Sequence, residues 1–247
     1  MMNRRHWMSG VAGGAVMAAG PWCAGAAPAG IRRRVFVHGR SQQGRDPGAL
    51  KAEWLTALKG GAAAIGQALP LNWQWVQAVL RALDKNSPGM GQETLEAFTR
   101  DVFLYVTRAG VRDEIDRIAA AALTEEPTIV VSHSLGTVVS YSVLRNDRRA
   151  LQVPLLVTLG SPLAVRSVRD QFRPLGFPQP VGRWYNAFDT RDVVSLYPLD
   201  ANNFPLPKPI ENNPGVRNPT DNRHGATGYL DDAEVVRHIL SALEVKA

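Results

Sequence analysis

The sequence predicts an α/β fold, with helices on both faces of a mostly parallel β-sheet. Predicted strands alternate with predicted helices, and the strands at 127–131 and 153–159 are apolar almost throughout. Such strands are typical of a parallel sheet that is buried on both sides. The chain has 247 residues, of which 45% are hydrophobic and 20% charged. We therefore expect a single domain over residues 31–247, large enough to bury a core.

The elements in the first half of this domain follow from local patterns. Residues 31–39 are β-branched and aromatic and end in glycine, which predicts a strand followed by a turn. Residues 47–59 predict a helix, opened by a proline and carrying apolar residues four apart. Residues 72–83 fit either a strand or a helix. Residues 92–123 predict a helix in two pieces that break near Gly110.

The second half continues the alternation and then departs from it. Residues 135–144 predict a helix, and residues 183–188 predict a strand by their aromatic side chains. Six prolines fall between residues 198 and 219, which indicates a long irregular loop. Residues 231–243 predict an amphipathic helix that closes the domain.

The net charge of +6 arises from the start of the chain. Residues 1–45 hold seven arginines and no acidic residue, whereas residues 46–247 carry 21 basic and 22 acidic side chains. Nucleic-acid binding needs basic charge spread over a folded face, so we expect no nucleic-acid partner. The single cysteine, Cys23, excludes an internal disulfide framework and a zinc site built on cysteines.

Residues 1–30 predict an export signal or a disordered leader. They contain the pair Arg4-Arg5, no charge from residue 7 onward, and a small-residue cleavage site at 24–26. The start of the chain resembles a twin-arginine export signal, which implies a periplasmic protein. The alternative is a cytoplasmic protein whose leader is not a signal. No later segment is long and apolar enough for a transmembrane span, so we expect none in the mature chain.

Ser134 is the candidate nucleophile, because it lies where the apolar strand at 127–131 leads into a helix. A serine at such an elbow has a strained backbone and needs small residues two positions before and after it. Ser132 and Gly136 meet that need. The amide of Leu135, at the helix N-terminus, is available to bind an oxyanion. The alternative is an ordinary turn between a strand and a helix.

A serine hydroxyl needs a base to accept its proton, and His224 is the favoured histidine. It lies on a polar loop just before the last helix. His133 is adjacent to the serine, and neighbouring residues of an extended chain point to opposite sides. His38 is expected to shape a loop that supplies a second oxyanion amide. His238 lies off the apolar stripe of the last helix and is expected to be solvated.

An acid must orient the histidine and stabilise its charged form. Asp189 and Asp192 both follow the strand at 183–188, at the edge of the sheet where α/β proteins build their sites. Asp170 and Asp221 are weaker alternatives. The residues alone leave the choice between the first two open.

Four segments that carry chemistry occur in a fixed order along the chain: 35–39, 132–136, 192–194 and His224. In this order they resemble the α/β-hydrolase superfamily, and within it the lipase-like serine hydrolases. The resemblance implies the compact form of that fold. It favours Asp192 over Asp189 as the acid, because a valine follows closely. It also implies that the amide of Arg40 is the second oxyanion donor, beside that of Leu135.

We therefore expect a serine hydrolase that cleaves carboxylic esters through an acyl-enzyme on Ser134. The expected substrate is a small-molecule or lipid-like ester, and neither a metal nor an organic cofactor is implied. An acyltransferase or a thioesterase with the same three residues is the nearest alternative. A catalytically inactive binding domain on the same fold is the alternative from another class.

Overall fold

The six described strands form one parallel sheet. The computed structural model describes residues 33–37, 46–64, 74–78, 101–221 and 223–244. The strand order is β2-β1-β3-β4-β5-β6, and every neighbouring pair is parallel. The strands are β1 (Arg33–Val37), β2 (Gln74–Ala78), β3 (Thr128–His133), β4 (Val153–Leu159), β5 (Val181–Ala187) and β6 (Glu211–Asn213). The predicted α/β class with a parallel sheet is thereby confirmed.

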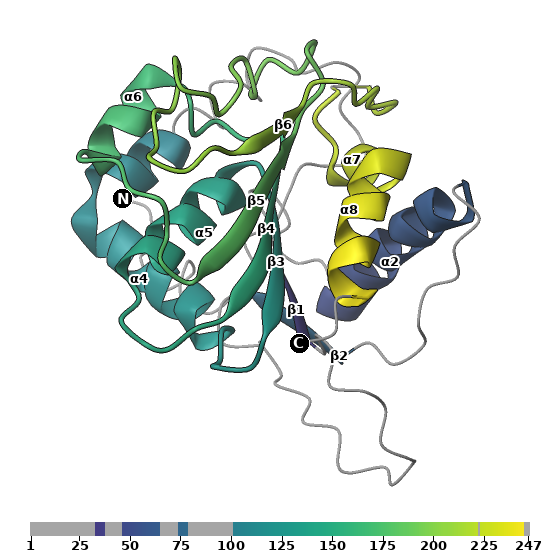
Figure 1. The fold of residues 1–247 in the computed structure, drawn as a ribbon, viewed down its shortest axis with the longest axis horizontal. Helices are drawn as coiled ribbons and strands as arrows, with labels where there is room; N and C mark the ends of the chain where they lie inside the picture. Colours follow the sequence, from purple (N-terminus) through teal and green to yellow (C-terminus); the bar gives the residue numbers. More distant parts are fainter. Residues whose placement is uncertain (1–32, 38–45, 65–73, 79–100, 222, 245–247) are drawn as a thin grey trace, which may run out of the picture.

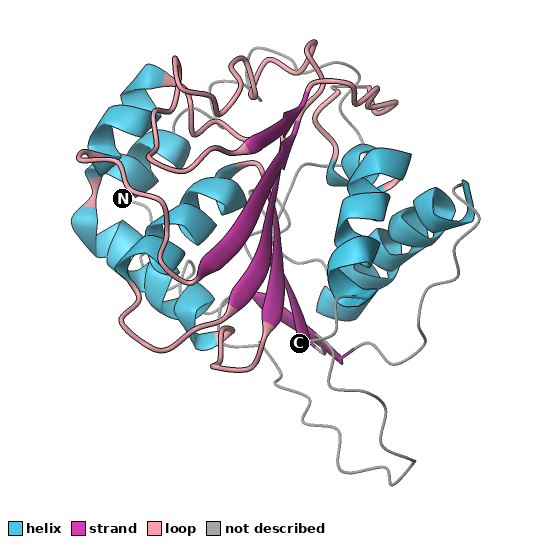
Figure 2. Cartoon of the chain, in the orientation of Figure 1, coloured by secondary structure: helices cyan, strands magenta, loops and turns pink. Residues whose placement is uncertain are grey.

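Helices lie on both sides of this sheet (Figure 1). Helices α4, α5 and α6 cover one face, and α2, α7 and α8 cover the other, so the sheet is the middle of three layers (Figure 2). The bounds are α2 (Pro47–Ala64), α4 (Ala109–Ala121), α5 (Leu135–Asn146), α6 (Arg166–Arg169), α7 (Ala226–Leu230) and α8 (Ala233–Glu244). In the described part of the chain, no helix has the length and hydropathy needed to cross a bilayer.

Two apolar clusters, one on each face, form the core. Val130 and Leu156 belong to the cluster that includes residues of α4 and α5. Their neighbours Ile129 and Leu155 belong to the cluster that includes residues of α2 and α8. Successive side chains of a strand point to opposite faces, so a central strand with both faces covered must be apolar at every position. This explains the continuous apolar runs of β3 and β4.

The structure defines element boundaries that the local patterns give only approximately. The helical region before β3 breaks near Gly110 as predicted, at Arg108, which has an extended backbone between the helix at 101–107 and α4. Helix α2 continues beyond residue 59 to Ala64. The ambiguous residues 72–83 contain strand β2, and α7 is a separate short helix before α8. The predicted leader, residues 1–30, lies outside the described residues.

The proline-rich loop predicted at 198–219 contains the edge strand β6. Among the described strands it pairs with β5 alone. Its three residues are polar, so it carries no apolar periodicity from which it could be predicted. The side chain of Asn212 secures the segment. Its Oδ1 accepts hydrogen bonds from Asn186 Nδ2 and the amide of Leu199, each at 2.9 Å.

His238 differs from its expected solvated state. Its ring stacks on Tyr185, with 3.8 Å between the ring centroids, and Nε2 lies 3.3 Å from a carboxylate oxygen of Glu211. The side chain is half-buried because its ring is covered by Tyr185 of β5 and lies beside Glu211 of β6.

Candidate active site

Ser134 joins β3 to α5 with a backbone conformation that side chains rarely adopt. Its φ is 57° and its ψ is −132°. This left-handed region costs a non-glycine residue energy and is common at functional sites. The amide of Ser134 donates to Leu159 O at 3.0 Å, and Ser132 Oγ donates to Val157 O at 3.0 Å. Strand β4 therefore holds both residues of the elbow in place.

Thr137 secures the elbow from the helix side. Its amide and its hydroxyl donate to Ser134 O at 2.9 and 2.7 Å. Ser161 Oγ lies 2.8 Å from Thr137 Oγ1, and the amide of Leu163 donates to Ser161 Oγ at 3.2 Å. Because the Thr137 hydroxyl uses its only proton on Ser134 O, the Ser161 hydroxyl donates to Thr137. The segment after β4 thus supports the turn that carries Ser134.

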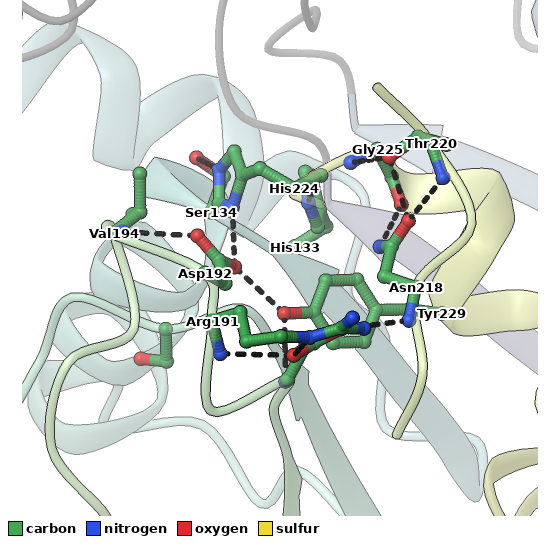
Figure 3. A network of polar contacts seen from close by, with 12 residues as sticks. His133, Ser134, Arg191, Asp192, Val194, Asn218, Thr220, His224, Gly225 and Tyr229 are labelled. Atoms are coloured by element: carbon green, nitrogen blue, oxygen red, sulfur yellow. Dashed lines mark hydrogen bonds and ion pairs between the residues drawn. The ribbon is translucent and has the colours of Figure 1, made fainter. Parts of the chain in front are cut away.

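The structure brings Ser134, His224 and Asp192 together in one hydrogen-bonded chain (Figure 3). His224 Nε2 lies 2.8 Å from Ser134 Oγ, and His224 Nδ1 lies 2.7 Å from Asp192 Oδ2. None of the three residues is more than 3% exposed. Both imidazole nitrogens are engaged, one on the hydroxyl and one on the carboxylate. This is the arrangement that lets an imidazole accept a hydroxyl proton while a carboxylate balances the resulting charge.

Asp192 is buried, yet it has the partners that a charged carboxylate needs. Tyr229 Oη donates to Oδ2 at 2.6 Å, and the amide of Val194 donates to Oδ1 at 2.9 Å. Burial acts to raise the pKa of this carboxyl, but His224 and these two donors act in the opposite direction. The pKa of Asp192 therefore lies below its ordinary value.

Asp189, the alternative acid, is engaged elsewhere. It forms an ion pair with Arg191 at 2.7 Å, and its Oδ2 accepts the amide of Asn218 at 2.9 Å. The Arg191 guanidinium lowers the pKa of Asp189 to about 2, against the effect of burial. Of the weaker candidates, Asp170 pairs with neighbouring arginines and Asp221 is exposed. Among these four aspartates, Asp192 is the one hydrogen-bonded to His224.

The loop that carries His224 is tied down by side chains on both sides of it. Asn218 Nδ2 donates to Gly225 O at 2.8 Å, and Asn218 Oδ1 accepts the Thr220 hydroxyl at 2.6 Å. The amide of Gly225 donates to Thr220 Oγ1 at 2.9 Å. Arg223, just before the histidine, has a φ of 55°. These contacts fix the backbone from which the imidazole projects.

The sequence predicts that His133 and Ser134 point to opposite sides of the strand, and His133 contacts the loop of His224 rather than the Ser134 hydroxyl. Its Nε2 donates to His224 O at 2.7 Å, and the two rings lie 4.7 Å apart between centroids. A carbonyl can only accept, so Nε2 carries the proton. The residue next to the candidate nucleophile therefore holds the backbone of the candidate base.

Leu135 is the first residue of α5, and its amide belongs to the turn whose donors have no carbonyl one turn earlier. It is suitably placed to bind a negative oxygen near Ser134. The second expected donor, the amide of Arg40, lies outside the described residues, as does His38. Within the described ranges, no group of three or more histidine, cysteine, aspartate or glutamate side chains could hold a metal ion.

Two residues of the site lacked a functional prediction. Gly160, directly after β4, has a φ of 55°, and a Cβ at this position would lie 3.1 Å from both Asp192 Oδ2 and His224 Cε1. Tyr229 contacts Asp192 from α7. The position of Gly160, directly after an apolar strand, could have indicated a turn at the site. No pattern in the sequence indicates a role for Tyr229, because its contact with Asp192 depends on how α7 packs.

The sequence matches no protein-family model, and no curated protein matches it.

Gly160→Ala is expected to destabilise the fold, because an alanine in the left-handed region costs about 1–2 kcal/mol. The new methyl group would also press on Asp192 and His224. The free energy of unfolding in urea measures the effect. Gly110→Ala is the matched control, since Gly110 lies in α4 with nothing within 4 Å of the added Cβ. That variant should gain about 0.5–1 kcal/mol. Equal changes in the two variants would contradict the prediction.

Proposed function

We propose that this protein is a serine hydrolase that cleaves carboxylic esters through an acyl-enzyme on Ser134. The observation that carries the proposal is the unbroken chain from Ser134 Oγ through both nitrogens of His224 to Asp192 Oδ2. The left-handed backbone of Ser134 supports it, because it presents a hydroxyl at the start of a helix as nucleophile elbows do.

In the proposed reaction, Ser134 Oγ attacks the ester carbonyl as His224 Nε2 takes its proton. Asp192 balances the charge of the imidazolium and keeps Nδ1 protonated in the resting state. The proton then passes from His224 to the departing alkoxide, and an alcohol leaves. A water molecule repeats the sequence on the acyl-enzyme and releases the acid.

The tetrahedral intermediate carries its negative charge on the former carbonyl oxygen. We assign the amide of Leu135 and the N-terminus of α5 to its stabilisation, because both lie next to Ser134. The amide of Arg40 is the proposed second donor. One such donor contributes typically about 10²–10³ in kcat.

The proposal places the chain in the α/β-hydrolase superfamily, with the lipase-like members. Its support is the parallel sheet and the order of nucleophile, acid and histidine along the chain. An apolar surface after Asp192 favours a lipid-like ester. Val193, Leu196 and Tyr197 are 48%, 57% and 47% exposed, which is unusual for a run of large apolar side chains.

Ser134→Ala is expected to lower ester turnover by about 10⁶-fold, because it removes the nucleophile. Labelling by a fluorophosphonate probe should disappear, while the thermal melt stays unchanged. Ser140→Ala, which alters a buried serine on α5, is the control and should retain turnover. Full activity in folded Ser134→Ala protein would rule out this site. Release of free acid by the wild type separates hydrolysis from acyl transfer.

Asp192→Asn is expected to lower kcat by about 10⁴-fold, because the amide cannot balance the imidazolium or hold its tautomer. Asp189→Asn should cost far less turnover, since its carboxylate contacts Arg191 and Asn218 rather than His224. Turnover at saturating ester compares the two variants, with folding checked by thermal melts. If Asp189→Asn loses turnover and Asp192→Asn retains it, Asp189 rather than Asp192 is the acid.

We also propose that residues 1–30 direct export to the periplasm, on the basis of Arg4-Arg5 and the uncharged run that follows. The mature protein should then begin near Ala27. N-terminal sequencing of protein isolated from its native host measures this. Recovery of Met1 or Met2 as the first residue would overturn the proposal.

A further inference from the structure

We propose that Tyr229 is a positioning residue for the reaction, acting through Asp192 by holding this carboxylate in its charged form and in the orientation that faces His224. The inference rests on the proposed function, because it concerns how the acid of that site is maintained. Its geometry is independent of the substrate.

Tyr229 and His224 bond to the same oxygen. Tyr229 Oη lies 2.6 Å from Asp192 Oδ2, and His224 Nδ1 lies 2.7 Å from it. The other oxygen, Oδ1, accepts the amide of Val194 at 2.9 Å. A carboxylate held at both oxygens cannot rotate about its Cβ–Cγ bond without losing a hydrogen bond. The tyrosine therefore helps to keep Oδ2 directed at the imidazole.

The direction of the tyrosine proton is determined by its second partner. The amide of Asp189 donates to Tyr229 Oη at 3.2 Å. The backbone N–H of Asp189 can only donate, so it cannot accept the single hydroxyl proton of Tyr229. An ionised carboxylate can only accept, so that proton lies between Oη and Asp192. The backbone of one aspartate thus orients the hydroxyl toward the other.

Tyr229 keeps its proton to higher pH than an ordinary tyrosine does. Burial raises the pKa of its hydroxyl far above the ordinary value, and the charge of Asp192 raises it further. The hydroxyl therefore does not release its proton to other groups of the site. Its contribution is a fixed dipole directed at a buried negative charge.

The local sequence explains why this tyrosine reaches the acid. Gly225 is the N-cap of α7, and Tyr229 lies on that short helix five residues after His224. A side chain at Gly228 would collide with Asn218 Oδ1, at 2.1 Å from the added Cβ. The close contact lets α7 lie against the loop of the histidine. The base and the donor to the acid therefore belong to one continuous segment.

The charged and titratable groups around this hydroxyl come from three segments. The loop after β5 contributes Asp192 and the Asp189–Arg191 ion pair. Strand β3 contributes His133, whose ring lies 5.9 Å from that of Tyr229 between centroids. The loop before α7 contributes His224. Only Asp192 accepts the tyrosine proton among these described groups, so removal of the hydroxyl acts first on Asp192.

This donor lowers the affinity of the Asp192–His224 pair for a proton. The hydrogen bond from Tyr229 is strongest when the carboxylate is charged and the imidazole neutral, which is the state that starts the reaction. The two groups titrate as a pair, so the argument holds whichever atom takes the proton. Without the hydroxyl, the pair binds a proton more tightly, and the inactive protonated state persists to higher pH.

Tyr229→Phe tests the proposal, because it removes the hydroxyl and keeps the ring. We expect kcat to fall about 10- to 100-fold, which is the factor that corresponds to the loss of one hydrogen bond to a charged group. The acid limb of the pH profile of kcat/KM should move to higher pH. Tyr141→Phe is the matched control, since that buried hydroxyl bonds to Gly176 O at 3.1 Å on the other face of the sheet. Its profile should coincide with that of the wild type.

Proton NMR provides a readout that needs no turnover. The proton between His224 Nδ1 and Asp192 gives a resonance far downfield, and it should move in Tyr229→Phe because the carboxylate becomes a stronger acceptor. Replacement of Tyr229 alone by a fluorotyrosine, a stronger donor of nearly the same shape, should move the acid limb to lower pH. The fluorotyrosine protein also serves as the test if the phenylalanine variant fails to fold.

The outcomes separate the two proposals. A lower kcat with an unchanged acid limb and an unchanged resonance would overturn the role of Tyr229 and leave the esterase proposal standing. A shifted resonance in a protein that turns over no ester would support the role of Tyr229 toward Asp192 and contradict the proposed function.

Discussion

A buried negative charge at the carboxyl edge of the sheet is the constraint on which the rest of the site depends. Asp192 is 1% exposed, and a carboxylate removed from water is strongly destabilising unless it is paired and hydrogen-bonded. Its three donors come from two separate segments, the residue Val194 on its own loop and His224 and Tyr229 on the loop and helix that follow β6. The charge is stable only when both segments are in place.

A second aspartate joins the same two segments at a distance from the imidazole. Asp189 bonds to Arg191 within its own turn and to the amide of Asn218 in the loop of the histidine. The side chain of Asn218 in turn donates to the carbonyl of Gly225, the N-cap of α7. The two aspartates thus have different roles. Asp189 supports the loop of the histidine, and Asp192 faces the imidazole.

Much of the site could be predicted from the sequence because its residues follow elements with clear patterns. Ser134 ends an apolar strand between small residues, and His224 lies in a polar loop before an amphipathic helix. The choice between Asp192 and Asp189 required either a resemblance or the structure, since both lie in the loop after β5. The hydrogen bond from His224 to Asp192 favours Asp192.

The remaining parts depend on tertiary contacts that leave no local pattern. Strand β6 is a polar edge strand of three residues, and it lies in a proline-rich segment whose sequence predicts a loop. The helix break near Gly110 could be predicted, but not that it lies at one extended residue, Arg108. Gly160 and Tyr229 matter because of atoms far away in the sequence, including the Asp192 carboxylate. Periodicity reports which face of an element is buried, not which atom it meets.

Under the proposed function, the separation of Ser134 and His224 along the chain determines when the two side chains can meet during synthesis. The two residues are 90 positions apart, and at typical rates a ribosome needs roughly 5–20 s to cover that distance. Tyr229 and α8 leave the ribosome later still. A nascent chain therefore carries the serine elbow well before it carries His224, the proposed base. The hydrogen-bonded chain of Ser134, His224 and Asp192 forms only after the segment that follows β6 has been made, and the same segment adds α7 and α8 to their face of the sheet.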